Sequence, residues 1–321
     1  MINTQFTEIT GCQVPIQLAG MPGVATNELA SAVSNSGGLG MISGTHMSPE
    51  FLLDVINNLK KLTSQPFGVN FLMPFLDRDS VKIAALKSRV VEFFYGDPDS
   101  SLVDIVHNEG ALACWQIGST KEALLAEKAG CDLIVAQGTE SGGHVRGDIK
   151  LLSLLSEVLD RVNVPVIAAG GLGTAGDITK VLKSGAVAAR IGTRFLAAKE
   201  SDAHPKYVQA LIDASAEDTV LTETFSLGWP HAHHRVLKSC VAEVNSFEGD
   251  IVGERDLAGE KKPVPKGSTA LPTINTTGKI EAMALYAGES VGAVKTVKSA
   301  ADIMNELVEG LPSALGTSTV E

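Results

Sequence analysis

The chain has 321 residues, of which 44% are hydrophobic, so it can bury a sizeable core and fit within one α/β barrel. Its 37 acidic and 26 basic side chains give a formal net charge of −11, which argues against nucleic acid or an anionic membrane surface as a partner. No uncharged apolar stretch of about 18 residues occurs, so we expect no membrane-spanning helix.

The cysteines indicate the cellular compartment. They are widely spaced and form no C-x-x-C pair, which excludes a zinc ribbon and a thioredoxin-type motif: Cys12, Cys114, Cys131 and Cys240. Reduced thiols of this kind predict a cytoplasmic protein. The N-terminal stretch MINTQFTEITG also lacks the apolar region of a secretion signal.

Eight short apolar runs, each typical of a buried strand, recur along the chain with helical patterns between them. They cover residues 15–21, 39–43, 67–72, 90–95, 111–117, 133–137, 165–169 and 187–191. Their starts lie about 20–30 residues apart, which is the length of one strand, one helix and two loops. Strands that alternate with helices imply a parallel sheet with right-handed crossovers.

Capping residues support helices between these runs. Thr26 precedes a predicted helix at residues 27–35, and Ser48 followed by Pro49 is typical of a helix start. Another helix is predicted at residues 121–128, after Thr120 and before a glycine. Eight strand–helix units predict a (β/α)₈ TIM barrel.

A doubly wound open sheet is the competing fold, and it would usually carry its Gly-rich phosphate turn after the first strand. Here residues 20–23 (GMPG) lack the G-x-G-x-x-G spacing. Gly-rich turns instead follow runs six, seven and eight, and barrels frequently bind phosphate after strands seven and eight. The positions of these turns therefore favour the barrel.

We expect three parts in the chain. Residues 1–198 would form the barrel units and hold the cofactor. Residues 199–277 are too long and too mixed for a simple loop, which predicts an insertion that partly covers the barrel mouth. Residues 278–321 would form a helical region that closes the barrel, broken near residues 288–292.

The stretch QGTESGGHVRG at residues 137–147 follows the sixth run. Its adjacent glycines let backbone approach a ligand closely, and His144 follows at once with the side chain best suited to proton transfer. Two more glycine turns, AAGGLG at residues 168–173 and RIGTRF at residues 190–195, suggest one phosphate-bearing cofactor. The alternative is that these glycines only permit tight turns.

These stretches together resemble the nitronate monooxygenase family, formerly called 2-nitropropane dioxygenases, which are FMN-dependent barrel enzymes. The resemblance includes PIQLAGMPGVATNELASAVSNSGGLG, FGVNFLMP, QGTESGGHVRG, AAGGLGTAGDI, IGTRFLAA, WPHAHHRVLKS and YAGESVG. The first and third stretches are also similar to those of the flavin-dependent enoyl-ACP reductases. Fold and cofactor therefore follow from the resemblance more directly than the substrate does.

The resemblance implies FMN-binding positions in two of the glycine turns, where backbone N–H groups and one hydroxyl suit a phosphate: Gly171, Arg190, Ile191, Gly192 and Thr193. It also implies flavin contacts at Met21, Asn70, Gln137 and Gly142. The two amides offer both a donor and an acceptor to the isoalloxazine edge, although they equally suit loop capping, and Met21 equally suits a core position.

His144 is the expected catalytic residue. By the resemblance it lies over the flavin, where it takes a proton from the carbon next to a nitro group or hydrogen-bonds the nitro oxygens. The expected reaction is oxidation of an alkyl nitronate by O₂ to a carbonyl compound and nitrite. Two alternative functions remain: an NAD(P)H-dependent reductase of enoyl-thioesters or quinones, and a non-enzymatic flavin-binding barrel. The protein could also form a homo-oligomer.

The stretch WPHAHHRV contains three histidines that could suggest a metal-binding site: His231, His233 and His234. Their H-x-H-H spacing does not place all three on one helical or strand face, and no carboxylate or cysteine is adjacent, so we expect no metal. Only His234 matches the family pattern WPxxxHRV. Glu140 could orient His144 or Arg146.

Overall fold

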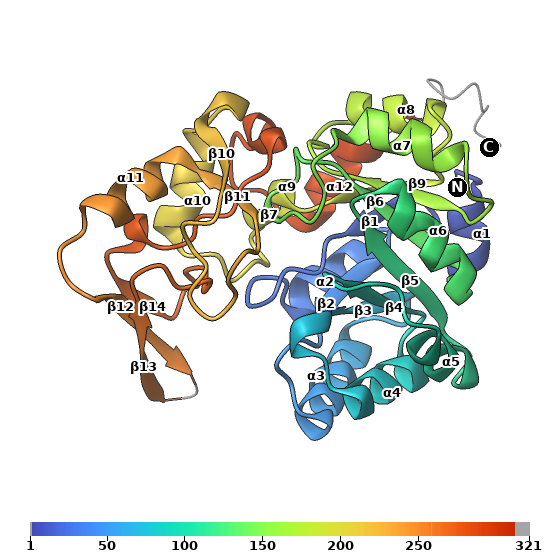
Figure 1. The fold of residues 1–321 in the computed structure, drawn as a ribbon, viewed down its shortest axis with the longest axis horizontal. Helices are drawn as coiled ribbons and strands as arrows, with labels where there is room; N and C mark the ends of the chain where they lie inside the picture. Colours follow the sequence, from blue (N-terminus) through green and yellow to red (C-terminus); the bar gives the residue numbers. More distant parts are fainter. Residues whose placement is uncertain (1, 258, 312–321) are drawn as a thin grey trace.

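The computed structural model describes residues 2–257 and 259–311 (Figure 1). All eight predicted strands are present and pair in parallel: β1 Ile16–Leu18, β2 Gly40–Ser43, β3 Phe67–Leu72, β4 Val90–Phe94, β5 Leu112–Ile117, β6 Leu133–Gln137, β8 Val166–Ala169 and β9 Ala188–Ile191. The last strand pairs with the first, and β1 also bonds the chain before β2, through Leu18 N–H to Leu39 O (2.9 Å) and Leu39 N–H to Ile16 O (2.9 Å). The predicted TIM barrel is therefore confirmed.

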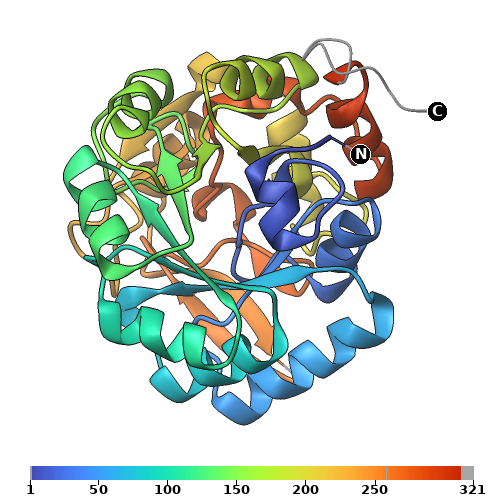
Figure 2. The same cartoon turned by 90° about the vertical axis from the view of Figure 1, so that its right-hand side faces the viewer.

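Helices surround the strands, as Figure 2 shows. They are α2 Asn27–Asn35, α3 Pro49–Leu62, α4 Arg78–Lys87, α5 Ser100–Asn108, α6 Thr120–Ala129, α7 Leu151–Leu159, α8 Ala175–Lys183 and α12 Ala300–Val308, with the short α1 Gln5–Thr10 at the start and α9 Thr193–Leu196 after β9. The expected caps are formed by Thr26, which accepts from Leu29 N–H, and Ser48, which accepts from Phe51 N–H. The cap of α6 is Ser119, one residue before the expected Thr120.

Buried apolar side chains of the barrel strands and the surrounding helices form one core. Trp115 on β5 and Phe93 on β4 are fully buried, with ring centroids 4.8 Å apart. The closing helix α12 belongs to this core through Ile303, Met304 and Leu307, and it contacts α2 and α8. At residues 279–299 of the predicted closing region the structure forms only the 3₁₀ turns η3 Ile280–Ala282 and η4 Glu289–Ala293, and residues 312–321 of that region lie outside the described residues.

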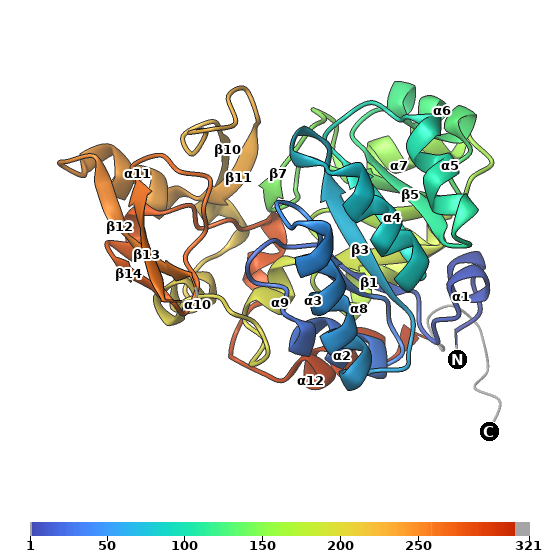
Figure 3. The same ribbon diagram turned by 90° about the horizontal axis from the view of Figure 1, so that it is seen from below.

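A second apolar core lies in the insertion that follows β9. Its elements are α10 Pro205–Ile212, β10 Thr219–Thr222, β11 His234–Leu237, α11 Lys238–Ser246, β12 Ile251–Leu257, β13 Glu260–Pro265 and β14 Thr276–Gly278. The strand β7 Gly143–His144, from the loop after β6, pairs with β11 and so joins barrel to insertion (Figures 1 and 3). The division at residues 198 and 277 stays a prediction.

The sequence also led to expectations about membrane-spanning helices and about the cysteines. In the described ranges 2–257 and 259–311, none of the helices combines the length and apolar character that a membrane crossing needs. The four cysteines are free and buried.

Candidate active site

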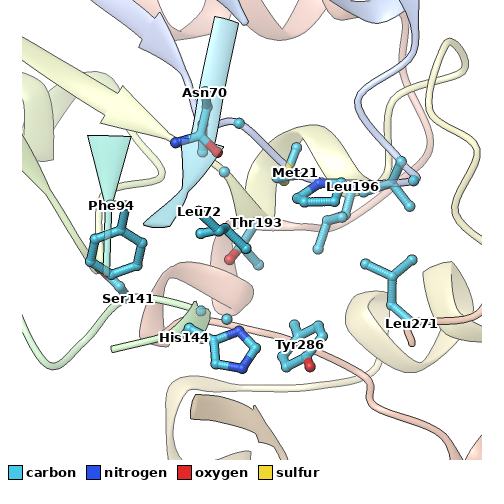
Figure 4. A pocket seen from close by; sticks show the side chains of 18 of the residues that line it. Met21, Asn70, Leu72, Phe94, Ser141, His144, Thr193, Leu196, Leu271 and Tyr286 are labelled. Carbon is cyan, nitrogen blue, oxygen red and sulfur yellow. The ribbon is translucent and has the colours of Figure 1, made fainter. Parts of the chain in front are cut away.

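A cavity of about 520 Å³ lies where the carboxyl ends of the barrel strands meet the insertion (Figure 4). All the sequence-predicted site residues except Ile191 line it: Met21, Asn70, Gln137, Gly142, His144, Gly171, Arg190, Gly192 and Thr193. The side chain of Ile191 is fully buried in β9, among core residues, and its carbonyl accepts from Ala19 N–H (2.9 Å). The fold thus brings together residues that are far apart in sequence.

A buried carboxylate supports the floor of this cavity. Glu92 on β4 is fully buried and accepts hydrogen bonds from Asn70 Nδ2 (2.8 Å) and Gln17 Nε2 (3.1 Å). It also pairs with the buried guanidinium of Arg190, which donates in addition to Gln116 Oε1. Because Glu92 holds the amide nitrogen of Asn70, the amide oxygen remains for the cavity.

The loop after β6 is fixed by its pairing with the insertion. Gly143 has a φ of 77°, which permits the turn that places His144 opposite His234 of β11. Gln137 Nε2 donates to the carbonyl of His144 (2.9 Å). Within the described chain, Gln137 Oε1 and His144 Nε2 are buried atoms without a hydrogen-bond partner. Such orphaned atoms on a cavity wall fit a polar ligand.

Aromatic rings enclose His144. Its imidazole stacks on Trp229, with centroids 4.0 Å apart and planes 24° apart, and Tyr95 and Tyr286 lie at 5.9 and 5.7 Å. Figure 4 shows His144 and Tyr286 on one side of the cavity and Asn70 and Met21 on the other. Burial, and secondarily the neighbouring His234, lowers the pKa of His144 to about 3, so its imidazole is neutral at neutral pH.

Of the histidines at residues 231–234, one is buried and structural and two are exposed. The ring of His234 is fully buried, with Nδ1 2.8 Å from Ala232 O and Nε2 accepting from Phe225 N–H (3.1 Å). Both ring nitrogens are therefore hydrogen-bonded, and the ring is neutral. His233 and His231 both approach Glu223, at 3.1 and 3.8 Å. In the part of the chain that the structure describes, no group of three or more His, Cys, Asp or Glu side chains could hold a metal ion.

The turns after β8 and β9 form the other end of the cavity. Gly170 and Gly171 have φ values of 114° and 68°, which glycine adopts readily. Gly192 precedes α9, whose first N–H groups have no partner within the helix. Thr193 Oγ1 accepts from Gly288 N–H (3.0 Å), so its hydroxyl hydrogen is left to donate elsewhere. These donors suit a phosphate group.

The charge of the cavity differs from that of the whole protein. No Asp or Glu is among its described lining residues, whereas Arg190 and Arg255 both are. A wall of amide oxygens, backbone N–H groups and arginines fits a flavin with a phosphate tail and a second, anionic ligand.

Several residues have other partners than we expected. Glu140 orients neither His144 nor Arg146; its carboxylate accepts from Leu151 N–H (2.9 Å) at the start of α7. Arg146 pairs with Glu122 and Asp97, and it does not line the cavity.

Other residues of the site were not singled out from the sequence. They include Glu92 under the floor and the lining side chains His46, Phe75, Phe94, Gln116, Trp229, Arg255 and Tyr286. Only Trp229 and Tyr286 carried a signal, since both lie in stretches that resemble the family. Ser290 of η4 also lines the cavity.

Comparisons with known proteins show the family of the chain. The sequence profile described as Nitronate monooxygenase matches residues 3–82 and 76–310. A probable nitronate monooxygenase of Staphylococcus aureus (strain JH9) is 30% identical over 293 residues, which cover 77% of this chain and 82% of the relative.

Solved structures extend the comparison to the fold. A FabK mutant from Thermotoga maritima aligns with a TM-score of 0.82 and 31% identity over 98% of both chains. A nitroalkane oxidase from Streptomyces ansochromogenes aligns with a TM-score of 0.79 and 28% identity over 97% of this chain and 99% of that one. Together with the profile match, these likenesses show that the chain belongs to the nitronate monooxygenase family of flavin-dependent oxidoreductases.

Proposed function

We propose that the protein uses FMN to oxidise alkyl nitronates with O₂, giving a carbonyl compound and nitrite. The observation that carries the proposal is the buried, unpartnered Nε2 of neutral His144 on a cavity whose described lining has no carboxylate. Such a site accepts an anionic substrate without repulsion and offers it a hydrogen-bonding ring. The four free, buried cysteines support a cytoplasmic location as part of this proposal.

FMN is the proposed flavin because the cavity has donors for a phosphate. Gly171, Gly192 and Thr193 would hold the phosphate, and the amide oxygens of Asn70 and Gln137 would accept from the ring. The bound flavin supplies the electron transfer and the reactivity toward O₂. The protein contributes binding, orientation and restricted access of water.

His144 acts on the nitro group in this proposal. When Nε2 carries the proton, the neutral imidazole donates a hydrogen bond to an oxygen of the nitronate. A nitronate is already deprotonated and needs no base. The low pKa of His144 makes it a weak base toward a neutral nitroalkane, so the nitronate should be the better substrate.

The aromatic side chains limit the space above the flavin. Trp229 stacks on His144, and Phe75 meets Trp229 edge to face at 5.1 Å. Tyr286 is held in place, since its hydroxyl donates to Thr269 O (2.9 Å). These rings would keep bulk water away from the reacting carbon and favour alkyl substrates.

A second candidate is an NAD(P)H-dependent reductase of enoyl-thioesters or quinones. It is supported by the resemblance of residues 15–40 to flavin-dependent enoyl-ACP reductases and by the overall likeness to FabK. The same cavity and the same flavin would serve both reactions.

Steady-state assays of the FMN-loaded protein distinguish the two functions. We expect O₂ consumption and nitrite release with propyl-2-nitronate, and no NADH or NADPH oxidation with a crotonyl thioester or a quinone. Nicotinamide-dependent turnover without any nitrite release would replace the first function by the second.

A further inference from the structure

Arg255 projects from the insertion onto the cavity. It lies on β12, paired with Lys262 of β13 and Thr276 of β14, and it lines the cavity together with Gly23 of the turn after β1. Its Nη2 lies 4.0 Å from the position that a Cβ would occupy at Gly23. The guanidinium therefore stands where the insertion meets the barrel rim.

This guanidinium has no partner in the described chain. Its Nε is buried without a hydrogen-bond partner, and no carboxylate among the described residues forms an ion pair with its side chain. Burial lowers the pKa of Arg255, with no acidic neighbour to offset the effect. By contrast, Arg190 pairs with Glu92 and Arg194 pairs with Glu306. A partly buried, unpaired positive charge is costly unless a ligand compensates it.

Arg255 and the glycine turns come from different elements around the cavity. Gly171 and Thr193 follow β8 and β9, on the barrel rim, whereas Arg255 comes from the insertion and stands over the turn after β1. The FMN affinity of an Arg255 variant therefore decides whether the guanidinium serves the cofactor phosphate or a second anion.

We propose that Arg255 binds a carboxylate or phosphate carried by the molecule that shares the cavity with the flavin. A guanidinium presents parallel N–H donors that match either group. The inference rests on the proposed function and narrows its substrates to those with a second anionic group. Under the proposed function this anion is the carboxylate of a nitronate, and under the second candidate function it is the phosphate of a nicotinamide nucleotide.

Kinetics with a matched pair of substrates test whether the anion bound by Arg255 is the carboxylate of a nitronate. Arg255→Gln is compared with wild type on the nitronates of γ-nitrobutyrate and of its methyl ester. We expect KM for the acid to rise about tenfold or more, with kcat and the ester almost unchanged, since a charged hydrogen bond is lost. The control is Lys261→Gln, which removes a positive charge from the opposite face of the same hairpin. Equal losses on acid and ester would overturn the proposal.

Binding without turnover tests the site independently of the reaction. Glutarate, inorganic phosphate and NADPH are titrated against the flavin absorbance of the holoprotein under argon. We expect the Kd of at least one of them to rise about tenfold in Arg255→Gln and not in Lys261→Gln. Loss of NADPH affinity alone assigns the anion to the nucleotide; loss for glutarate assigns it to a carboxylate.

Two further outcomes are decisive. Unchanged Kd values for all three anions would overturn the proposal, and so would a tenfold weaker FMN affinity in Arg255→Gln, because the guanidinium would then serve the cofactor. If neither nitronate is turned over, the proposed function fails, while the anion titrations still decide the role of Arg255.

Discussion

Asn70 Nδ2 donates a 2.8 Å hydrogen bond to Oε1 of the fully buried Glu92, one layer beneath the cavity. This bond fixes which end of the amide is free. The nitrogen is committed to the carboxylate, and the oxygen faces the cavity, as Figure 4 shows. A residue that does not line the cavity thereby determines that Asn70 presents an acceptor to the cavity.

Glu92→Gln should loosen this arrangement. The amide of Asn70 loses its anionic acceptor and can turn, and Arg190 keeps a buried charge without its partner. We expect the Kd for FMN, measured by flavin fluorescence, to rise about tenfold, and the free energy of unfolding to fall by about 3 kcal/mol.

A double-mutant cycle shows whether Glu92 acts through Asn70. In an Asn70→Ala background, Glu92→Gln should have little further effect on FMN affinity while still lowering the melting temperature. The same tenfold loss of affinity in both backgrounds would contradict the positioning role.

The pH dependence of turnover should lack a histidine inflection. The pKa of His144 is lowered to about 3, so its imidazole stays neutral from about pH 5 to pH 8. With a nitronate as substrate, we expect kcat/KM to stay constant across this pH range, with no inflection near pH 6.5. His144→Asn should lower kcat/KM at least tenfold at every pH and retain FMN. An inflection near pH 6.5 that disappears in His144→Asn would show that the ring titrates normally.

The same pKa affects stability in acid. The unfolded state binds a proton on His144 below about pH 6.5, whereas the folded state resists protonation until about pH 3. Stability should therefore fall as the pH drops from 6.5 toward 3. We expect His144→Gln to flatten this fall in urea unfolding midpoints of the apoprotein between pH 7 and pH 5. A variant with the wild-type pH dependence would count against a buried neutral ring.

Gly142→Ala should disturb the phosphate end of the cavity. A Cβ at this position would stand 2.5 Å from Gly288 N, the group that donates to Thr193 Oγ1. We expect a loss of about 1–3 kcal/mol in unfolding free energy and weaker FMN binding. Gly292→Ala in η4 is the matched control, since its Cβ would meet nothing within 4 Å. Equal behaviour of the two variants would show that the close approach at Gly142 does not matter.

The barrel could be predicted because its signals are local. Each strand is a short apolar run, and caps such as Thr26 and Ser48 mark helix starts through bonds to residues three positions away. The strand ends depend on long-range pairing: the sequence predicts strand at residues 19–21, but the ladder between β1 and β9 stops at Leu18 and the chain turns to line the cavity.

The candidate site could be predicted only in part, because its polar and aromatic contacts are long-range. Nothing near Glu92 in sequence indicates that Asn70, Gln17 and Arg190 converge on it across the barrel. Likewise, the pairing of β7 with β11, which sets His144 beside Trp229, depends on how the insertion folds over the barrel. Glycine turns predict which end of the barrel borders the cavity, but they do not show which side chains face the cavity.

Anaerobic mixing of the FMN-loaded protein with propyl-2-nitronate, and separately with NADH, distinguishes nitronate oxidation from nicotinamide-dependent reduction. We expect rapid bleaching of the flavin absorbance by the nitronate, none by NADH, and nitrite release when O₂ is admitted. Bleaching by NADH with no response to the nitronate would contradict the proposed function.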